Sequence, residues 1–250
     1  MKNIKAFGLA ILLMVLIGSM SGCIQITVNT TSDESSAPSI SNTPEKQEST
    51  SSETGENATS ELPHTVPNGY TIPDTNMTIS VPEDAVVLSV DTPAGDAAWS
   101  KAGILDASEK IKEMQKNGTT AEIVAANGDT IAVAEKSSDY ANSVFNLNNL
   151  DEKGKKDFLK YMEPSSMDGS TTGTITWYDH AQIPFFMIDI CAENIKEEGP
   201  VYERLYGTLY DGKIVSFDLF GDTKEISEET DAFMRAVVDS AVISAFAENP

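Results

Sequence analysis

The sequence predicts an α+β fold with a mostly antiparallel sheet and helices on both of its faces. Two features near the C-terminus carry this prediction. Residues 201–210 and 213–220 alternate in hydrophobicity around Asp211-Gly212, a dipeptide typical of two-residue β-hairpin turns. Residues 223–244 follow with the pattern of a helix. Because both strands are apolar on both faces, other elements must cover each side of the sheet.

The turn at Asp211-Gly212 also predicts the register of this hairpin. It pairs Tyr206 with Phe217 and Arg204 with Leu219. One face then carries Tyr206, Val215, Phe217 and Leu219, and the other carries Leu205, Leu209, Ile214 and Phe220. In the helix that follows, Ser227 is a suitable N-cap, and Phe233, Val237 and Ala241 form the predicted apolar stripe.

The preceding elements follow from alternation, capping and turn residues. Residues 77–81 and 85–90 are predicted strands, and residues 98–99 have no predicted class. Residues 106–116 are a predicted helix, capped by Asp106 or Ser108, with Ile111, Met114 and Gln115 along one side. Residues 120–134 are a predicted hairpin that turns at Asn127-Gly128.

Residues 151–162 are a second predicted helix, with Phe158, Leu159 and Met162 facing inward and Pro164 ending it. Residues 173–178 and 184–193 are predicted strands that lead to the C-terminal hairpin. The resulting order is β-β-α-β-β-α-β-β-β-β-α. This order favours antiparallel pairing of strands that are neighbours in sequence.

That order, the early strand ended by Pro82, the Asp-Gly hairpin and the closing VVDSAVIS helix resemble the PsbP-like superfamily over residues 70–244. The superfamily includes the photosystem extrinsic protein PsbP, the Ran-binding Mog proteins and many small prokaryotic lipoproteins. The resemblance implies an α/β/α sandwich. It also implies a protein-binding or assembly role, since characterised relatives act in that way and some hold metals. It transfers no residue-level motif to this chain.

The N-terminus has the pattern of a lipoprotein signal peptide. Lys2 and Lys5 precede an apolar run of about fifteen residues, and Ser21-Gly22 precede Cys23. This resembles the lipobox of prokaryotic lipoproteins, in which the cysteine receives diacylglycerol, although Met20 stands where that family prefers Leu. We therefore expect a signal peptide over residues 1–22 and lipid attachment at Cys23. The protein is expected on the extracytoplasmic side of the cell membrane.

The residues after Cys23 are expected to form a disordered tether. Residues 23–67 are rich in Ser, Thr, Glu, Asn and Pro and contain few large apolar side chains. Such a segment cannot bury enough surface to offset its ordering entropy. A single α+β domain is then predicted over residues 68–250.

Charge and residue counts exclude several functions. The formal net charge is −22, which argues against nucleic acid as a partner and against a polybasic grip on anionic lipid. The chain has two cysteines and two histidines, too few for most His-based or Cys-based metal sites. No P-loop, G-x-G-x-x-G or C-x-x-C motif occurs, so no cofactor is expected and no metal site is assigned.

The polar residues that could carry chemistry are Asp189, Asp218 and His180. The two aspartates lie within apolar predicted strands, and burial of a lone carboxylate is costly. Arg204 and Arg235 are the only arginines, so we expect them to pair with these aspartates. His180 lies in a predicted turn, where a surface position is the simplest expectation.

These observations leave three hypotheses for function. The leading one is a lipid-anchored binding or accessory module that recognises a protein or an envelope component. The alternative is an envelope hydrolase that uses the Asp189, Asp218 and His180 region, which requires these side chains to converge in one open site. A purely structural envelope protein is the third.

Overall fold

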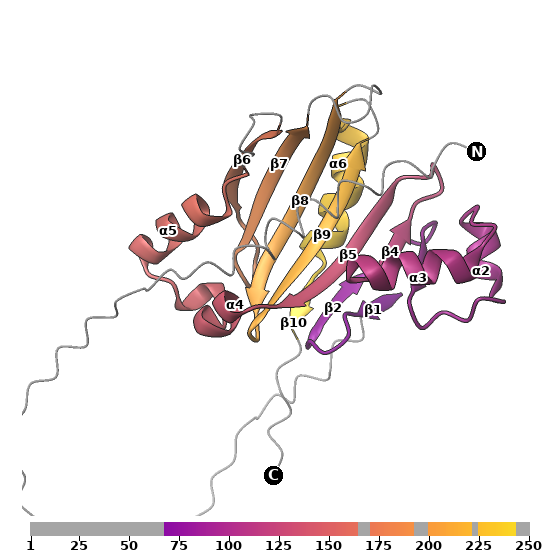
Figure 1. Cartoon of the computed structure of the whole chain (residues 1–250), viewed down its shortest axis with the longest axis horizontal. Coiled ribbons are helices and arrows are strands. Elements are labelled where there is room, and N and C mark those ends of the chain that lie inside the picture. The colour runs from indigo at the N-terminus through magenta and orange to yellow at the C-terminus, as the bar shows by residue number, and fades with distance from the viewer. Residues whose placement is uncertain (1–67, 165–170, 193–199, 222–224, 244–250) are drawn as a thin grey trace, which may run out of the picture. The chain divides into compact units, whose positions relative to one another are not determined.

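The computed structural model describes residues 68–164, 171–192, 200–221 and 225–243, which belong to one compact unit (Figure 1). The strands are β1 (Gly69–Thr71), β2 (Met77–Ser80), β3 (Val86–Ser89), β4 (Thr119–Val124), β5 (Thr130–Ser137), β6 (Thr171–Tyr178), β7 (Phe185–Ala192), β8 (Val201–Tyr210), β9 (Lys213–Gly221) and β10 (Val242–Ile243). The helices are α2 (Ala97–Lys101), α3 (Ala107–Asn117), α4 (Asp139–Val144), the 3-10 helix η1 (Leu147–Asn149), α5 (Glu152–Met162) and α6 (Glu228–Asp239).

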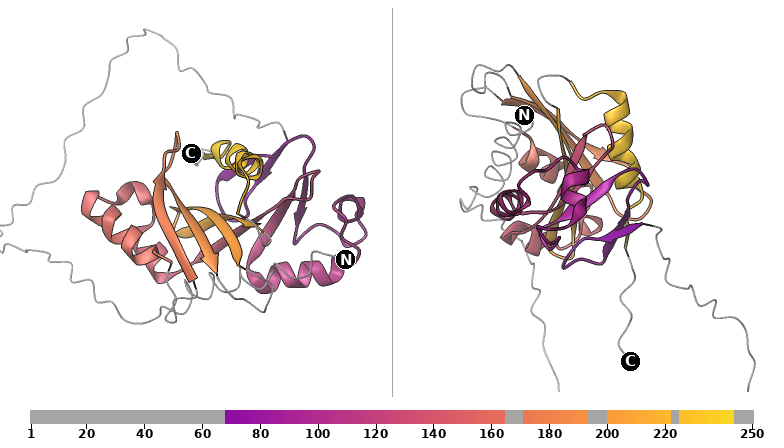
Figure 2. Two further views of the ribbon diagram at one scale, coloured as in Figure 1. Left: turned by 90° about the horizontal axis from the view of Figure 1, so that it is seen from above. Right: turned by 90° about the vertical axis from the view of Figure 1, so that its right-hand side faces the viewer.

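Seven strands form one sheet in the order β3-β4-β5-β9-β8-β7-β6, and every neighbouring pair is antiparallel. The sheet is strongly twisted, as Figure 2 shows. A second, smaller antiparallel sheet has the order β1-β2-β10. The strand order in sequence predicts one sheet, whereas the structure distributes the strands between two.

The register predicted for the C-terminal hairpin is confirmed. Tyr206 pairs with Phe217 and Arg204 pairs with Leu219. Asp211 and Gly212 have positive φ angles of 53° and 72°, as a turn of type I′ requires at its two central residues. A shift of one residue would move every side chain of β8 and β9 to the opposite face, so this turn determines which residues form each core.

The two faces of the large sheet bury different cores, which confirms the predicted α+β class with helices on both faces. On the α6 face, β8 and β9 pack against α6 and against the small sheet. The buried side chains of this core include Tyr206, Val215, Phe217 and Leu219 from the large sheet, Met234 and Val237 from α6, and Met77 and Ile79 from β2. On the opposite face, called the α3/α5 face, α4 and α5 cover one flank of the sheet and α2 and α3 cover the other (Figure 1).

The closing helix is shorter than the sequence predicts. It ends at Asp239, and Val242 and Ile243 form β10, which pairs with Thr78 and Met77 of β2. Ser240 ends the helix, because its hydroxyl donates to the Val237 carbonyl at 2.6 Å and accepts the Ser80 N–H at 2.8 Å. The β-branched residues that follow then add a strand to the small sheet.

Other local predictions are partly corrected. Gln115, predicted on the inner side of α3, is exposed, whereas Asn117 is buried. Of the stripe predicted for the closing helix, Val237 and Ala241 are buried and Phe233 is half-buried, and α6 also buries Met234 and Val238. The sequence did not predict α2, which buries Trp99, or α4.

Candidate functional site

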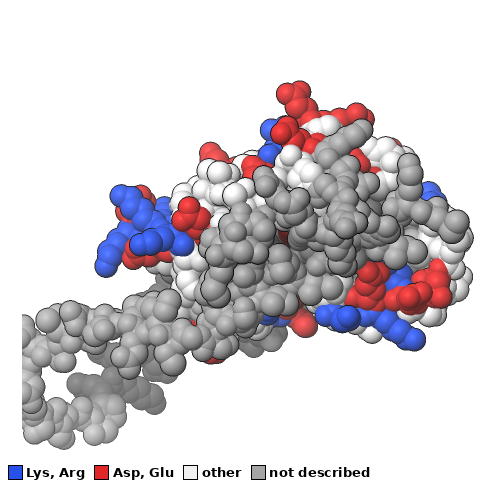
Figure 3. Space-filling model, turned by 45° about the horizontal axis from the view of Figure 1, so that its top comes forward, with Lys and Arg blue, Asp and Glu red and all other residues white. Residues whose placement is uncertain are grey.

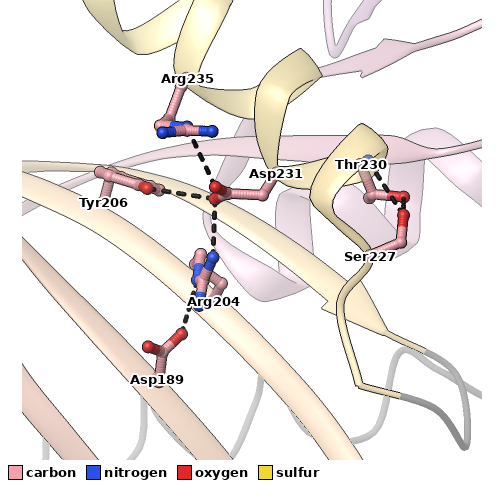
Figure 4. Close-up of polar contacts among 7 residues, drawn as sticks. All are labelled: Asp189, Arg204, Tyr206, Ser227, Thr230, Asp231 and Arg235. Atoms are coloured by element: carbon pink, nitrogen blue, oxygen red, sulfur yellow. Dashed lines mark hydrogen bonds and ion pairs between the residues drawn. The ribbon is translucent and has the colours of Figure 1, made fainter.

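An ion-pair network on the α6 face joins α6 to the sheet (Figure 4). Arg204 of β8 is at its centre. Its Nε donates to Asp189 Oδ1 of β7 at 2.6 Å, and its Nη1 lies 2.8 Å from Asp231 Oδ1 of α6. Asp231 also receives Arg235 Nε at 3.0 Å and the Tyr206 hydroxyl at 3.2 Å. Each charge in this network faces an opposite charge, so the network fixes α6 on β7 and β8.

Local sequence positions the acidic member of this network. Ser227 caps α6, since its hydroxyl accepts the Thr230 N–H at 3.1 Å (Figure 4). Asp231 then follows in the first turn, where the helix dipole favours a carboxylate. The hydrogen bond to Asp189, followed by that to Asp231, raises the pKa of Arg204, so this guanidinium stays charged.

The C-terminal end of α6 has a second contact with the sheet. The Tyr178 hydroxyl at the end of β6 donates to Asp239 Oδ1 at 2.6 Å. Burial, followed by this hydrogen bond, raises the pKa of Tyr178 to about 12. The phenol therefore remains a donor over the physiological range, and both ends of the helix are fastened to the sheet.

The α3/α5 face carries a different arrangement of charge. Asp218 of β9 and Glu203 of β8 point to this face, because Asp218 pairs across the strands with Leu205 and Glu203 pairs with Phe220. Their exposed fractions are 3% and 2%. The Ser216 hydroxyl donates to Asp218 Oδ2 at 2.9 Å, whereas Asp218 Oδ1 and Glu203 Oε2 have no hydrogen-bond partner among the residues that the structure describes.

Burial without a counter-charge favours the protonated form of both carboxyl groups. Burial raises the pKa of Asp218 to about 7, although the Ser216 hydroxyl opposes this increase. Burial, and then repulsion by Asp218, raises the pKa of Glu203 well above its usual range. The two groups, called the acid pair, are therefore protonated more easily than ordinary carboxyl groups.

A third acidic side chain on this face does have a cationic partner. Glu122 of β4 is 1% exposed, and its Oε1 lies 2.8 Å from Lys110 Nζ of α3. The contact is an ion pair rather than a well-aligned hydrogen bond, and burial still raises the pKa of Glu122. Lys110 thus joins α3 to the sheet in the way that Arg204 joins α6.

The structure separates the three residues of the hydrolase alternative. Asp189 and Asp218 lie on opposite faces of the sheet, so the expectation that arginine pairs with both is wrong for Asp218. His180 lies in the β6–β7 turn, where its Nδ1 accepts the backbone N–H of Gln182 at 3.2 Å and its ring packs against Phe185. These side chains do not converge, which removes the geometric basis of that alternative.

The other features considered in the sequence are the two cysteines, possible metal ligands and possible membrane-spanning segments. Cys191 is a half-buried free thiol on β7. Within the described ranges, no group of three or more His, Cys, Asp or Glu residues could hold a metal ion, and no helix is long and apolar enough to cross a bilayer. Cys23 lies outside the described residues, so its lipidation stays a prediction from the sequence.

Glu203, the second member of the acid pair, was not predicted from the sequence. It lies in VYERLYG, where Arg204 beside it suggests an exposed, charged stretch. The signal available in the sequence was the alternation of side-chain direction along β8, which places every second residue on the same face of the sheet. Glu203, Leu205, Gly207 and Leu209 share one face, and Leu205 and Leu209 were already assigned to a core.

Charged side chains of both signs lie close together on the surface. In the view of Figure 3, basic side chains gather at the left and at the lower right, and acidic ones lie beside both groups and at the top. Exposed Lys153, Lys156 and Lys160 lie on α5. The outer strand β6 carries no charged residue and exposes Thr172, Thr174 and Thr176. The domain therefore presents several chemically distinct surfaces.

The sequence matches no protein-family model and no curated protein. The structure is similar to the solution structure of cyanobacterial PsbP (CyanoP) from Synechocystis sp. PCC 6803, with 11% identity and a TM-score of 0.40, over 70% of this chain and 91% of that one. It is also similar to a crystal structure from Bacteroides thetaiotaomicron VPI-5482, with 9% identity and a TM-score of 0.34, over 70% of this chain and 47% of that one. The proposals below depend on the geometry of this chain.

Proposed function

We propose that this protein is a lipid-anchored, extracytoplasmic binding or accessory module that recognises a protein partner in the cell envelope. One observation carries the proposal. The polar groups that could perform chemistry are used to fasten helices to the sheet, as Arg204 is, or are separated onto opposite faces, as Asp189 and Asp218 are. A rigid domain of this kind is suited to present a surface to a partner.

The anchor and the location in this proposal are supported by the sequence pattern around Cys23. The expected tether, residues 23–67, would let the domain search for its partner at a distance from the membrane. As a flexible coil of this length, its end-to-end distance would be about 35 Å.

The binding role is tested by crosslinking in cells that produce the full chain with its native leader. After purification through a C-terminal tag, mass spectrometry identifies the crosslinked proteins. We expect one dominant partner in near-stoichiometric yield. The absence of an enriched protein, from cells in which the chain is abundant at the membrane, would contradict the proposal.

The anchor is tested separately with Cys23→Ser. Removal of the thiol removes the atom that would receive the lipid, so we expect the protein to move from the membrane fraction to the soluble fraction. Cys191→Ser is the matched control, because it removes the other thiol and leaves the leader unchanged. Membrane retention of Cys23→Ser equal to that of the control would contradict lipidation.

A further inference from the structure

Phe145, directly after α4, has an unfavourable backbone conformation. Its φ and ψ angles are 63° and −46°, and the Asn146 N–H donates to the Val144 carbonyl at 2.7 Å. These values describe the γ-turn with positive φ, which is rare and strained. The other non-glycine residues with positive φ in the described ranges are Asn68, Asp74 and Asp211. Asparagine and aspartate tolerate positive φ, whereas a bulky aromatic residue does not.

Neighbouring hydrogen bonds hold Phe145 in this conformation. Its N–H donates to the Ala141 carbonyl at 2.7 Å, and its own carbonyl accepts the Gly212 N–H at 2.9 Å. Both bonds use backbone atoms, so a glycine at position 145 could form them without strain. Nothing in these contacts explains why the residue is phenylalanine.

The aromatic ring gains little from burial in return. It is 52% exposed and belongs to none of the three hydrophobic cores. One edge of the ring lies against Gly212, where a Cβ atom would be 3.5 Å from Phe145 Cδ2. The turn therefore holds a large apolar side chain in a defined position, partly in water. Residues held in costly conformations are concentrated at functional positions.

The surroundings of the ring indicate the chemistry of a partner. Residues 140–149 contain no charged side chain, although the whole chain has a net charge of −22, and Gly212, against which the ring lies, is flanked by Asp211 and Lys213. Exposed Asn142, Ser143 and Asn148 lie next to Phe145 in the sequence. An aromatic anchor surrounded by amides and hydroxyls is the composition of surfaces that bind proteins through an apolar pocket and adaptable hydrogen bonds.

We propose that Phe145 is the anchor residue of the surface through which this module binds its protein partner, and that its ring enters an apolar pocket on that partner. This proposal rests on the function proposed above and specifies the surface that performs it. The fixed backbone around Phe145 lowers the entropy that the ring loses on binding.

The test compares three variants of the full, membrane-anchored chain in the crosslinking assay. Phe145→Ala removes the ring and keeps a Cβ atom in the strained turn. Phe145→Gly removes both the ring and the strain. Leu105→Ala is the matched control, because Leu105 is 101% exposed and lies on the separate segment between α2 and α3. We expect at least a tenfold lower yield of the partner with both Phe145 variants and an unchanged yield with Leu105→Ala.

Thermal unfolding of the purified chains shows whether lost binding results from lost folding. We expect Phe145→Gly to unfold about 2–4 °C above Phe145→Ala, because glycine tolerates the positive φ angle. A Phe145 variant that is at least as stable as the wild-type chain and yet does not capture the partner demonstrates that the Phe145 ring has a binding role. Phe145→Gly that unfolds well below Phe145→Ala would overturn the assignment of strain to this residue.

The two proposals fail in different ways. If the wild-type chain captures no protein partner, the proposed function is wrong. If the wild-type chain and Phe145→Ala capture the partner equally, the function stands and the assignment to Phe145 is wrong. Phe145-dependent pelleting with isolated envelope polysaccharide, without any protein partner, would replace the protein by a glycan and overturn this proposal.

Discussion

The two faces of the large sheet treat buried charge differently. On the α6 face, Arg204 lies between Asp189 and Asp231, and every charge has a partner at hydrogen-bond distance. On the α3/α5 face, Asp218 and Glu203 are almost fully buried, and within the described part of the chain each keeps an oxygen without a partner. The carboxylates around Arg204 are thus paired with a cation, whereas burial raises the pKa of both Asp218 and Glu203.

The difference follows from the alternation of β8. Glu203 and Arg204 are adjacent in sequence, so their side chains point to opposite faces of the sheet. Arg204 therefore reaches α6, and it cannot neutralise the carboxylate beside it in sequence. Adjacent opposite charges do not form a pair when they lie in one strand.

The largest expected effect is a dependence of stability on pH. A carboxyl group whose pKa is raised by folding stabilises the folded state fully below its unfolded pKa, near 4, and this contribution is lost as pH rises through the folded pKa, about 7 for Asp218. A difference of one unit between the folded and unfolded pKa values corresponds to about 1.4 kcal/mol in the free energy of unfolding. We therefore expect the free energy of unfolding, measured with urea, to fall by about 2–3 kcal/mol from pH 5 to pH 8.

Two variants assign this effect to the acid pair. Asp218→Asn keeps the shape of the side chain and removes its ionisation, so it should make the fall shallower and leave the part that is due to Glu203. Glu135→Gln removes a carboxylate that is already paired, since Glu135 Oε1 lies 2.6 Å from Lys213 Nζ, and should leave the fall in place. A fall in Asp218→Asn as steep as in the wild type would contradict the comparison of the two faces.

An intermediate effect is expected when the partnered face loses its central cation. Arg204→Met leaves Asp189 without its partner and Asp231 with only Arg235 and Tyr206. We expect the free energy of unfolding to fall by about 2 kcal/mol, since removal of one member exposes the desolvation cost of the others. Urea unfolding at pH 7 measures it.

Arg235→Met is the matched control for this prediction. Arg235 is 47% exposed and forms one ion pair within its own helix, so its loss should cost about 0.5 kcal/mol or less. Equal losses for the two arginine variants would mean that Arg204 does not fasten α6 to the sheet.

The smallest expected effect concerns the other end of α6. Tyr178→Phe removes the hydroxyl that donates to Asp239 and keeps the ring that packs on Tyr206. We expect a loss of about 0.5–1 kcal/mol, which corresponds to a decrease of about 1–4 °C in the midpoint of thermal unfolding. A loss as large as that of Arg204→Met would transfer the main attachment of α6 to this contact.

The sequence predicted most of the large elements because their signals are local. The hairpin at Asp211-Gly212 was predicted with its register, since the turn type determines which residues pair. Ser227 was predicted as a helix cap and is one. The strands β4 to β9 and the helices α3 and α5 follow from alternation, caps and breakers within a few residues.

The errors occur where distant contacts decide the structure. Val242 and Ile243 continue an apolar helical stripe in sequence, but pairing with β2 makes them a strand. The pairing of Asp189 with Arg204 was expected, whereas the isolation of Asp218 was not. Charges can be listed from a sequence, but their partners depend on which face each side chain occupies.

The sequence alone therefore determined the α+β class, the hairpin register and the helix cap, because each depends on neighbouring residues. Only the tertiary structure decided that Glu203 and Asp218 are buried with no cation beside them in the described part of the chain, that Arg204 binds Asp231, and that Phe145 is held in a strained turn by Gly212. Each of these depends on groups far apart in the chain that packing brings together.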